Sequence, residues 1–143
     1  MGNNFKFSLD KLLEMRIEKE EESKRHFTKA QREKQISEEK LTDLKDKHET
    51  YNCINKGESL VYQKIKRNYL LALDKAIKEE EKNLLIKNKE LEIRRDDLIK
   101  KQIERKTVDI LKERKKEEFI KEEERKEQIL IDELSLYAYL RNQ

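Results

Sequence analysis

The stretch Tyr51-Asn52-Cys53-Ile54-Asn55-Lys56-Gly57-Glu58-Ser59 is the one place in this 143-residue chain where the sequence favours a turn. The chain has no proline, and its only other glycine is Gly2, whereas proteins contain on average about 5% proline and 7% glycine. Asn55 and Gly57 tolerate the left-handed conformation that ends a helix, and Ser59 can accept from the free N–H groups of the next helix. The stretch therefore predicts a hairpin tip between two helices; the alternative is a flexible kink in one continuous helix.

The composition leaves little material for a globular core. Charged residues make up 47% of the chain and hydrophobic residues 34%, whereas compact domains are about half apolar. A narrow seam between two helices needs much less apolar surface than a globular core does. Disorder favours a high net charge, but here the net charge is only +3, and Leu and Ile recur at helical spacing. The sequence predicts an all-α fold, a long two-helix antiparallel coiled-coil hairpin.

Acidic and basic residues alternate along the chain instead of gathering on one face. A nucleic-acid-binding surface concentrates positive charge, so no nucleic-acid partner is expected. Many charges fall into i,i+4 pairs with the acid first, the order that favours a helix. These pairs are Glu20–Lys24, Glu21–Arg25, Glu90–Arg94, Asp96–Lys100, Asp97–Lys101 and Glu122–Lys126. They predict solvated helical faces.

Few residues offer redox, metal or membrane chemistry. Cys53 is the only cysteine, which excludes an internal disulfide and favours a reducing compartment. His26 and His48 have no thiolate or imidazole partner at metal-ligand spacing, so no metal or other cofactor is expected. Residues 1–6 lack the apolar core of a signal peptide, and the longest apolar runs, such as 69–73, are far too short to span a membrane. We therefore expect a soluble cytoplasmic protein without direct membrane insertion.

The turn divides the chain into a first helix over about residues 8–52, a hinge over 53–59 and a second helix over about 60–141. Residues 1–143 are thus expected to form a single coiled-coil hairpin. The first helix carries a stripe at alternating spacings of four and three: Leu9, Leu13, Arg16, Glu20, Ser23, Phe27, Ala30, Lys34, Ser37, Leu41, Leu44, His48 and Tyr51. The second helix carries an unbroken seven-residue repeat, typical of a coiled-coil seam, of Leu70, Ile77, Leu84, Leu91 and Leu98.

A register follows if the tip is centred between Ile54 and Gly57, because facing positions then lie at equal distances from it. The predicted apolar pairs are Leu41 with Leu70, Phe27 with Leu84, and Leu13 with Leu98. Since the second helix is the longer one, we expect it to overhang, without a partner in this chain, from about Glu104 onward.

Two apolar clusters lie outside this seam. Residues 104–128 are mostly charged, but residues 129–140 (ILIDELSLYAYL) are mostly apolar around most of the helix circumference. A helix that is apolar on all sides is normally surrounded, so this end is expected to insert into a partner; the alternative is packing on a neighbour or dimer partner. The second cluster is the face shared by Tyr69, Leu73 and Ala76 at i, i+4 and i+7, with Leu73 on the border of the seam. This face is either a thick core near the tip or a partner site.

Catalysis is not expected. The sequence has no glycine-rich loop that could hold a phosphate and no assembled Ser/His/Asp or Cys/His set. Two helices also offer no pocket that excludes water. We therefore expect a non-enzymatic protein that acts through recognition by its surfaces.

Three motifs occur in order along the chain: FKFSLDKLLEMR (5–16), NYLLALDKAI (68–77) and ILIDELSLYAYLR (129–141). Together with the length and the charged middle, they resemble the FliJ family of flagellar type III protein export. The most specific features are the aromatic-x-aromatic start with Leu12, Leu13 and Arg16, and then the Asp132–Glu133 pair in the apolar tail. The resemblance covers the full length of the chain.

The resemblance implies a coiled coil similar to the central stalk of rotary ATPases, whose termini insert into the export ATPase hexamer and promote its assembly and activity. The other partners implied are the cytoplasmic domain of the export-gate membrane protein and the export chaperones, at the flagellar basal body on the inner face of the cell membrane. The gate-binding residues implied are Tyr69, Leu73 and Ala76, with Tyr69 where the family has Phe. The ring-binding residues implied are Phe5, Phe7, Leu12, Leu13, Ile129, Leu130, Asp132, Glu133, Leu136, Tyr137 and Leu140.

Two other classes of function remain open. A structural coiled coil that self-associates as a dimer or scaffold predicts a concentration-dependent mass. A nucleic-acid-binding hairpin predicts steeply salt-dependent binding. The stalk predicts a stable monomer whose apolar end is covered only by the partner ring.

Overall fold

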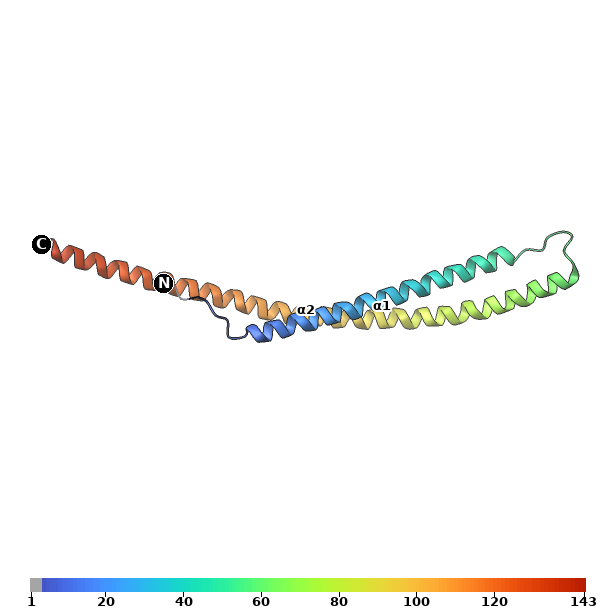
Figure 1. Ribbon diagram of the computed structural model, residues 1–143, viewed down its shortest axis with the longest axis horizontal. Helices are drawn as coiled ribbons and strands as arrows, with labels where there is room; N and C mark the ends of the chain where they lie inside the picture. The colour runs from blue at the N-terminus through green and yellow to red at the C-terminus, as the bar shows by residue number, and fades with distance from the viewer. Residues whose placement is uncertain (1–3) are drawn as a thin grey trace. The chain divides into compact units, whose positions relative to one another are not determined.

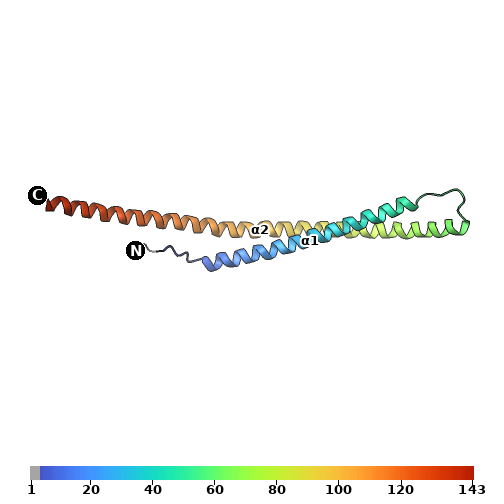
Figure 2. The ribbon, with the colours of Figure 1, turned by 45° about the horizontal axis from the view of Figure 1, so that its top comes forward.

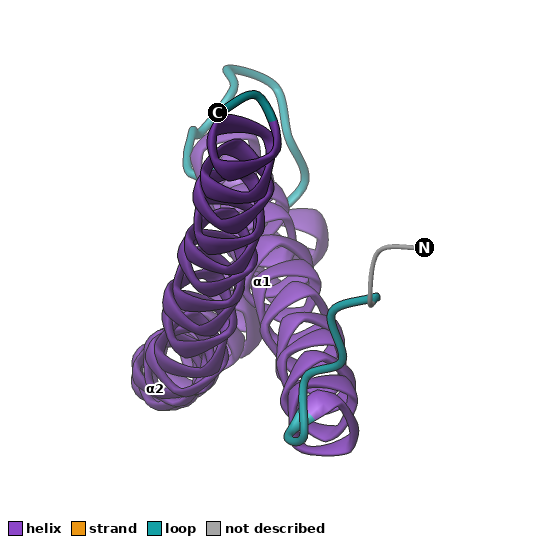
Figure 3. Cartoon of the chain, turned by 90° about the vertical axis from the view of Figure 1, so that its left-hand side faces the viewer, coloured by secondary structure: helices purple, strands orange, loops and turns teal. Residues whose placement is uncertain are grey.

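The protein folds into two long α-helices joined by one loop (Figure 1). The computed structural model describes residues 4–143, of which 89% are helical. Helix α1 spans Asp10–Tyr51 and helix α2 spans Leu60–Arg141. No strand occurs within the described range (Figure 3). The all-α two-helix hairpin predicted from the sequence is confirmed.

The chain divides into two compact units. The tip unit, Glu21–Lys100, contains most of α1, the loop and the first half of α2. The terminal unit, Met1–Glu20 together with Lys101–Gln143, contains the start of α1 and the rest of α2. The prediction that residues 1–143 form a single domain stays a prediction.

Both helices are long because nothing in their sequences interrupts them. Neither contains proline or glycine, the two residues that are least favourable inside a helix. Asp10 lies in the first turn of α1, and Arg141 lies in the last turn of α2. Each of these charges is favourable at its end of the helix dipole.

The loop turns at the residues that the sequence indicates. The N–H of Glu58 donates to the carbonyl of Asn55 at 3.4 Å, and Gly57 has a φ of +95°, a left-handed value that glycine adopts without strain. Ser59 caps α2, because its Oγ accepts from the N–H of Tyr62 at 3.2 Å. The predicted turn and cap are confirmed, and the continuous kinked helix is wrong.

In the tip unit, α1 and α2 lie side by side (Figures 1 and 2), but their register differs from the predicted one. His48 Nε2 lies 2.9 Å from Asp74 Oδ1. Leu41 is seven residues farther from the tip than His48 on α1, and Leu70 is four residues nearer the tip than Asp74 on α2. About 16 Å along the helix axis therefore separates two residues that were predicted to face each other. The Glu33–Lys87 ion pair, at 2.9 Å, shows a register shift in the same direction, so Phe27 and Leu84, the second predicted pair, do not face each other either.

The path of the loop explains the shift. Lys66 is buried under the loop, and its Nζ lies 3.2 Å from Glu58 Oε1 and 4.0 Å from Cys53 Sγ. Helix α1 ends at Tyr51, whose ring meets that of Tyr69 with 5.3 Å between centroids. The loop, and not α1, therefore contacts the first turns of α2, at Lys66. The symmetric tip assumed from the sequence is wrong for this reason.

The shifted register places polar seam residues of α1 opposite polar residues of α2. Ser37 Oγ donates to Glu80 Oε1 at 2.6 Å, and Ser23 Oγ donates to Asp97 Oδ2 at 2.9 Å. The buried apolar residues of this seam are Ala30, Leu41, Leu73 and Leu91. Polar and apolar layers alternate, so the polar middle of the α1 stripe is satisfied by hydrogen bonds and does not face aliphatic side chains.

In the terminal unit, the N-terminal segment packs along α2. The apolar cluster consists of the buried residues Phe7, Leu13 and Val108, with Phe5 and Leu12 packed against it. Leu13 therefore lies with Val108, farther along α2 than the predicted partner Leu98, and the third predicted pair is wrong as well.

The part of α2 that lacks a partner begins later than Glu104, where it was predicted to begin. Lys112 Nζ lies 2.8 Å from Asp10 Oδ1, and the ring of Phe119 lies 5.7 Å from that of Phe5. The residues that precede α1 are not helical. They run on along α2 beyond the start of α1, and this lengthens the contact between the two segments. Contacts within the chain thus reach Phe119.

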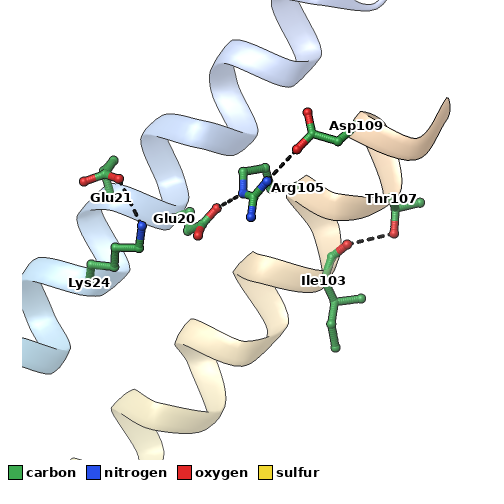
Figure 4. A network of polar contacts seen from close by, with 7 residues as sticks. All are labelled: Glu20, Glu21, Lys24, Ile103, Arg105, Thr107 and Asp109. Carbon is green, nitrogen blue, oxygen red and sulfur yellow. Dashed lines mark hydrogen bonds and ion pairs between the residues drawn. The ribbon is translucent and has the colours of Figure 1, made fainter. Parts of the chain in front are cut away.

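Arg105 joins the two helices of the terminal unit (Figure 4). Its guanidinium bonds the carboxylate of Glu20 on α1 and that of Asp109, one turn further along α2. Glu20 is only 4% exposed, and a buried carboxylate requires such a partner. A second ion pair, between Arg16 and Glu104, lies beside it.

Candidate interaction surfaces

Only part of the face predicted to bind the export gate is exposed. Tyr69 is 41% exposed, and its ring meets that of Tyr51 edge to face. Leu73 is 5% exposed and belongs to the seam, and Ala76 is half-buried. The structure therefore offers Tyr69 and the edge of Ala76 to a partner, with Leu73 underneath. A gate-binding role for these residues stays a prediction.

The predicted ring-binding residues near the N-terminus are largely covered by their own chain. Phe7 and Leu13 are buried against Val108, and Phe5 and Leu12 are half-buried at the edge of the same cluster. Lys112 Nζ also lies 5.9 Å from the centre of the Phe7 ring, a cation–π contact. These side chains hold the N-terminal segment on α2, and only the edges of Phe5 and Leu12 face outward.

The C-terminal end of α2 is the opposite case. We call residues 129–141 the C-terminal end; its large apolar side chains are all exposed: Ile129, Leu130, Ile131, Leu134, Leu136, Tyr137, Tyr139 and Leu140. Asp132 lies among them and accepts from Gln128 Nε2 at 2.9 Å, while Glu133 is exposed. Ile131, Leu134 and Tyr139 were not among the predicted ring-binding residues, although they belong to the same apolar segment, residues 129–140.

A further apolar surface at the hairpin tip was missed. Its exposed residues before Tyr69 are Tyr51, Ile54, Leu60, Val61, Tyr62 and Ile65. The sequence signal that could have found it is Leu60-Val61-Tyr62 directly after the capping serine, because three consecutive apolar residues cannot all point into one narrow seam.

Hydrogen bonds shift the pKa values of charged groups in the seam. The Ser37 hydroxyl, the Asn83 amide and the Lys40 ammonium hold the pKa of Glu80 below its ordinary value. The bond with Lys87 lowers the pKa of Glu33 in the same way. Within residues 4–143, no group of three His, Cys, Asp or Glu side chains could hold a metal ion. In the same range, no helix is both long and apolar enough to cross a bilayer.

These features define a class of protein: a two-helix coiled coil that offers exposed surfaces to partners. The chain belongs to the FliJ family, since the family model described as Flagellar FliJ protein matches residues 5–143, essentially the whole chain. No curated protein and no solved structure matches it. The family is a non-catalytic component of flagellar export, so this is a flagellar export-related protein.

Proposed function

We propose that the protein is a stalk-like coiled coil of the flagellar type III export apparatus, which inserts into the export ATPase hexamer and promotes its assembly. The observation that supports this most is the C-terminal end, where eight large apolar side chains are exposed around the helix. An apolar helix end of this kind requires a surrounding partner, and a ring with a central opening surrounds a helix on all sides.

The ring-binding residues divide into two roles. Ile129, Leu130, Leu136, Tyr137 and Leu140 contact the apolar lining of the ring, and Asp132 and Glu133 pair with basic groups there. Phe7 and Leu13 act indirectly, because they hold the N-terminal segment on α2 beside Val108. Phe5 and Leu12 contribute their exposed edges.

The gate-binding role rests on the tip unit. Tyr69 is the anchor that contacts the cytoplasmic domain of the export-gate protein, and Leu73 supports it from the seam. Ala76 borders the contact. Export chaperones are the third class of partner, and the site of action is the cytoplasmic face of the cell membrane at the flagellar basal body. In this proposal the whole chain acts as one hairpin.

The test is to mix the full chain with the flagellar export ATPase and to measure hexamer formation and ATP turnover. We expect both to rise with the full chain. The variant Leu136→Ser/Tyr137→Ser should lose the effect, whereas the control Ile36→Ser, at an exposed apolar residue of α1, should keep it. An ATPase that responds equally to all three proteins would contradict the proposal.

A second candidate is a self-associating coiled coil. Leu85, Ile86 and Ile93 on α2 are each more than 60% exposed, and an exposed apolar face of this kind suits a second copy of the chain. Sedimentation equilibrium distinguishes the two functions: a mass that rises with concentration, and that Leu85→Ser/Ile93→Ser returns to the monomer, favours the scaffold.

A further inference from the structure

The hairpin tip carries a large exposed apolar surface that the export role leaves unused. We call it the tip surface; it consists of Tyr51, Ile54, Leu60, Val61, Tyr62 and Ile65. Ile54 is 81% exposed, Leu60 83% and Val61 70%. Several large apolar side chains at this level of exposure, gathered at one end of the hairpin, indicate an interaction site.

The geometry of the tip surface decides what kind of partner can cover it. Leu60, Val61 and Tyr62 are consecutive on α2, so their side chains point about 100° apart around the helix. Ile54 comes from the loop, outside the helix. A partner helix covers one stripe of another helix, and it would leave at least one of these residues in water. A fluid apolar phase covers all of them.

The charge of the tip is positive. Residues 51–70 contain four basic residues and one acid, Glu58, which gives +3, the same as the net charge of the whole chain. Glu58 is already paired with the buried Lys66 at 3.2 Å. Lys56, Lys64 and Arg67 have no ion-pair partner within residues 4–143. The tip is therefore a locally basic part of the chain.

Apolar and basic groups line one hollow there. Its volume is about 850 Å³, and Ile54, Leu60 and Leu70 line it together with Lys64 and Arg67. Tyr51 lines it as well. Aliphatic side chains, basic groups and tyrosine are the three components that proteins use at the boundary between acyl chains and head groups.

We infer that the tip surface binds the interface of an anionic lipid bilayer. Ile54, Leu60 and Val61 enter the boundary of the acyl chains, Lys56, Lys64 and Arg67 pair with anionic head groups, and Tyr62 lies between. Nucleic acid suits the basic groups and tyrosines, but it gives the exposed aliphatic side chains no contact. The short apolar runs of the sequence predict no direct membrane insertion because none can span a bilayer, but binding to the surface requires no span. The inference is independent of the ATPase and the gate.

The test is co-sedimentation of the full chain with vesicles of phosphatidylcholine alone and with vesicles that contain about one third phosphatidylglycerol. We expect binding only to the anionic vesicles. Lys64→Gln/Arg67→Gln should weaken it about 25-fold, since each basic residue near an anionic surface contributes about fivefold. Leu60→Ser/Val61→Ser should weaken it about tenfold or more. All four side chains are exposed, so circular dichroism should show unchanged helicity.

Two matched controls make the result specific. Lys116→Gln/Lys121→Gln removes the same charge from exposed lysines of the terminal unit, and Ile131→Ser/Leu134→Ser removes comparably sized apolar groups from the C-terminal end. Both should bind vesicles like the unmodified chain. The inference is overturned if anionic vesicles are not bound, or if a control weakens binding as much as the tip variants. It is also overturned if a short single-stranded RNA binds with dependence on Lys64 and Arg67 while Leu60→Ser/Val61→Ser changes neither interaction, which would assign the tip to polyanion binding.

Discussion

The hairpin tip and the C-terminal end of α2 both expose large apolar side chains, but they differ in charge. The tip carries +3 over residues 51–70, whereas residues 129–141 contain Asp132, Glu133 and Arg141, one base against two acids. Exposed apolar surface indicates that a partner binds there, but it does not identify the partner. The charge around that surface indicates what the covering partner is.

The two ends are also built differently. The tip combines a loop with the first turns of a helix, fixed by the buried Lys66–Glu58 pair. The C-terminal end is a bare helix, whose polar contacts are short-range ones such as Gln128 with Asp132. A bare helix suits a narrow opening, and a broad basic tip suits a flat surface. Changing one end at a time tests whether charge and shape determine the partner of each end.

The largest effect is expected from removing residues 129–143. All described side chains there are exposed, so the truncated chain should keep its helicity up to the cut and its melting temperature within a few degrees. Stimulation of the export ATPase should fall to background, while vesicle binding through the tip should stay. Circular dichroism, ATP turnover and co-sedimentation measure the three quantities. Early unfolding of the truncated chain would mean that the C-terminal end belongs to the core.

The next effect separates core from surface beside the tip. Leu73→Ala should destabilise the protein by about 3 kcal/mol, because Leu73 is 5% exposed in the seam. Tyr69→Ala should cost less than about 1 kcal/mol, as surface changes do. Binding to the gate domain should nevertheless fall by about 2 kcal/mol or more, since an interface tyrosine is often an anchor. Thermal melting and a gate-domain pull-down provide the two readings. If Tyr69→Ala melts as early as Leu73→Ala and still binds, the gate site is misplaced.

Features that depend on local periodicity were predicted better than features that depend on tertiary placement. The seven-residue spacing identified the seam, and the missing prolines and glycines identified two uninterrupted helices, because both depend on neighbouring residues only. The register depends on where the loop lies, and the contact of Glu58 and Cys53 with Lys66 has no signature in the sequence. The same applies to Phe5, which packs on Phe119 before α1 begins.

Among the candidate surfaces, the C-terminal end was predictable because a long apolar run follows a charged one. The tip surface was not predictable. Leu60-Val61-Tyr62 resembles an ordinary helix start, and only the structure shows that the loop leaves these side chains exposed. The burial of Phe7 and Leu13 was equally hidden, because it requires knowing that the chain folds back on Val108.

A smaller effect tests the polar layers of the seam. Ser37→Ala removes the hydroxyl that donates to the buried Glu80, and we expect a loss of about 1 kcal/mol. Because the pKa of Glu80 is lowered in the folded protein, its stabilising contribution is present above the ordinary glutamate pKa of about 4.3 and is lost as the pH falls through the lowered value. Urea denaturation from pH 7 to pH 3 should therefore show a smaller acid-induced loss for Ser37→Ala. An unchanged pH profile would mean that Lys40 and Asn83 alone fix the charge of Glu80.

The smallest effect concerns the shape of the tip. Gly57 has a φ of +95° and nothing within 4 Å of an added Cβ, so Gly57→Ala strains the backbone without a steric clash and should cost about 1 kcal/mol. Gly57→Asn is the matched control, because asparagine tolerates the left-handed region and should lose less. Thermal melting measures both. Vesicle binding by Gly57→Ala should change less than threefold, because the apolar and basic side chains of the tip surface are all retained. A large loss of vesicle binding with Gly57→Ala alone would mean that the tip recognises lipid through a fixed loop conformation and not through its composition, and the contrast with the C-terminal end would then be one of shape and not of charge.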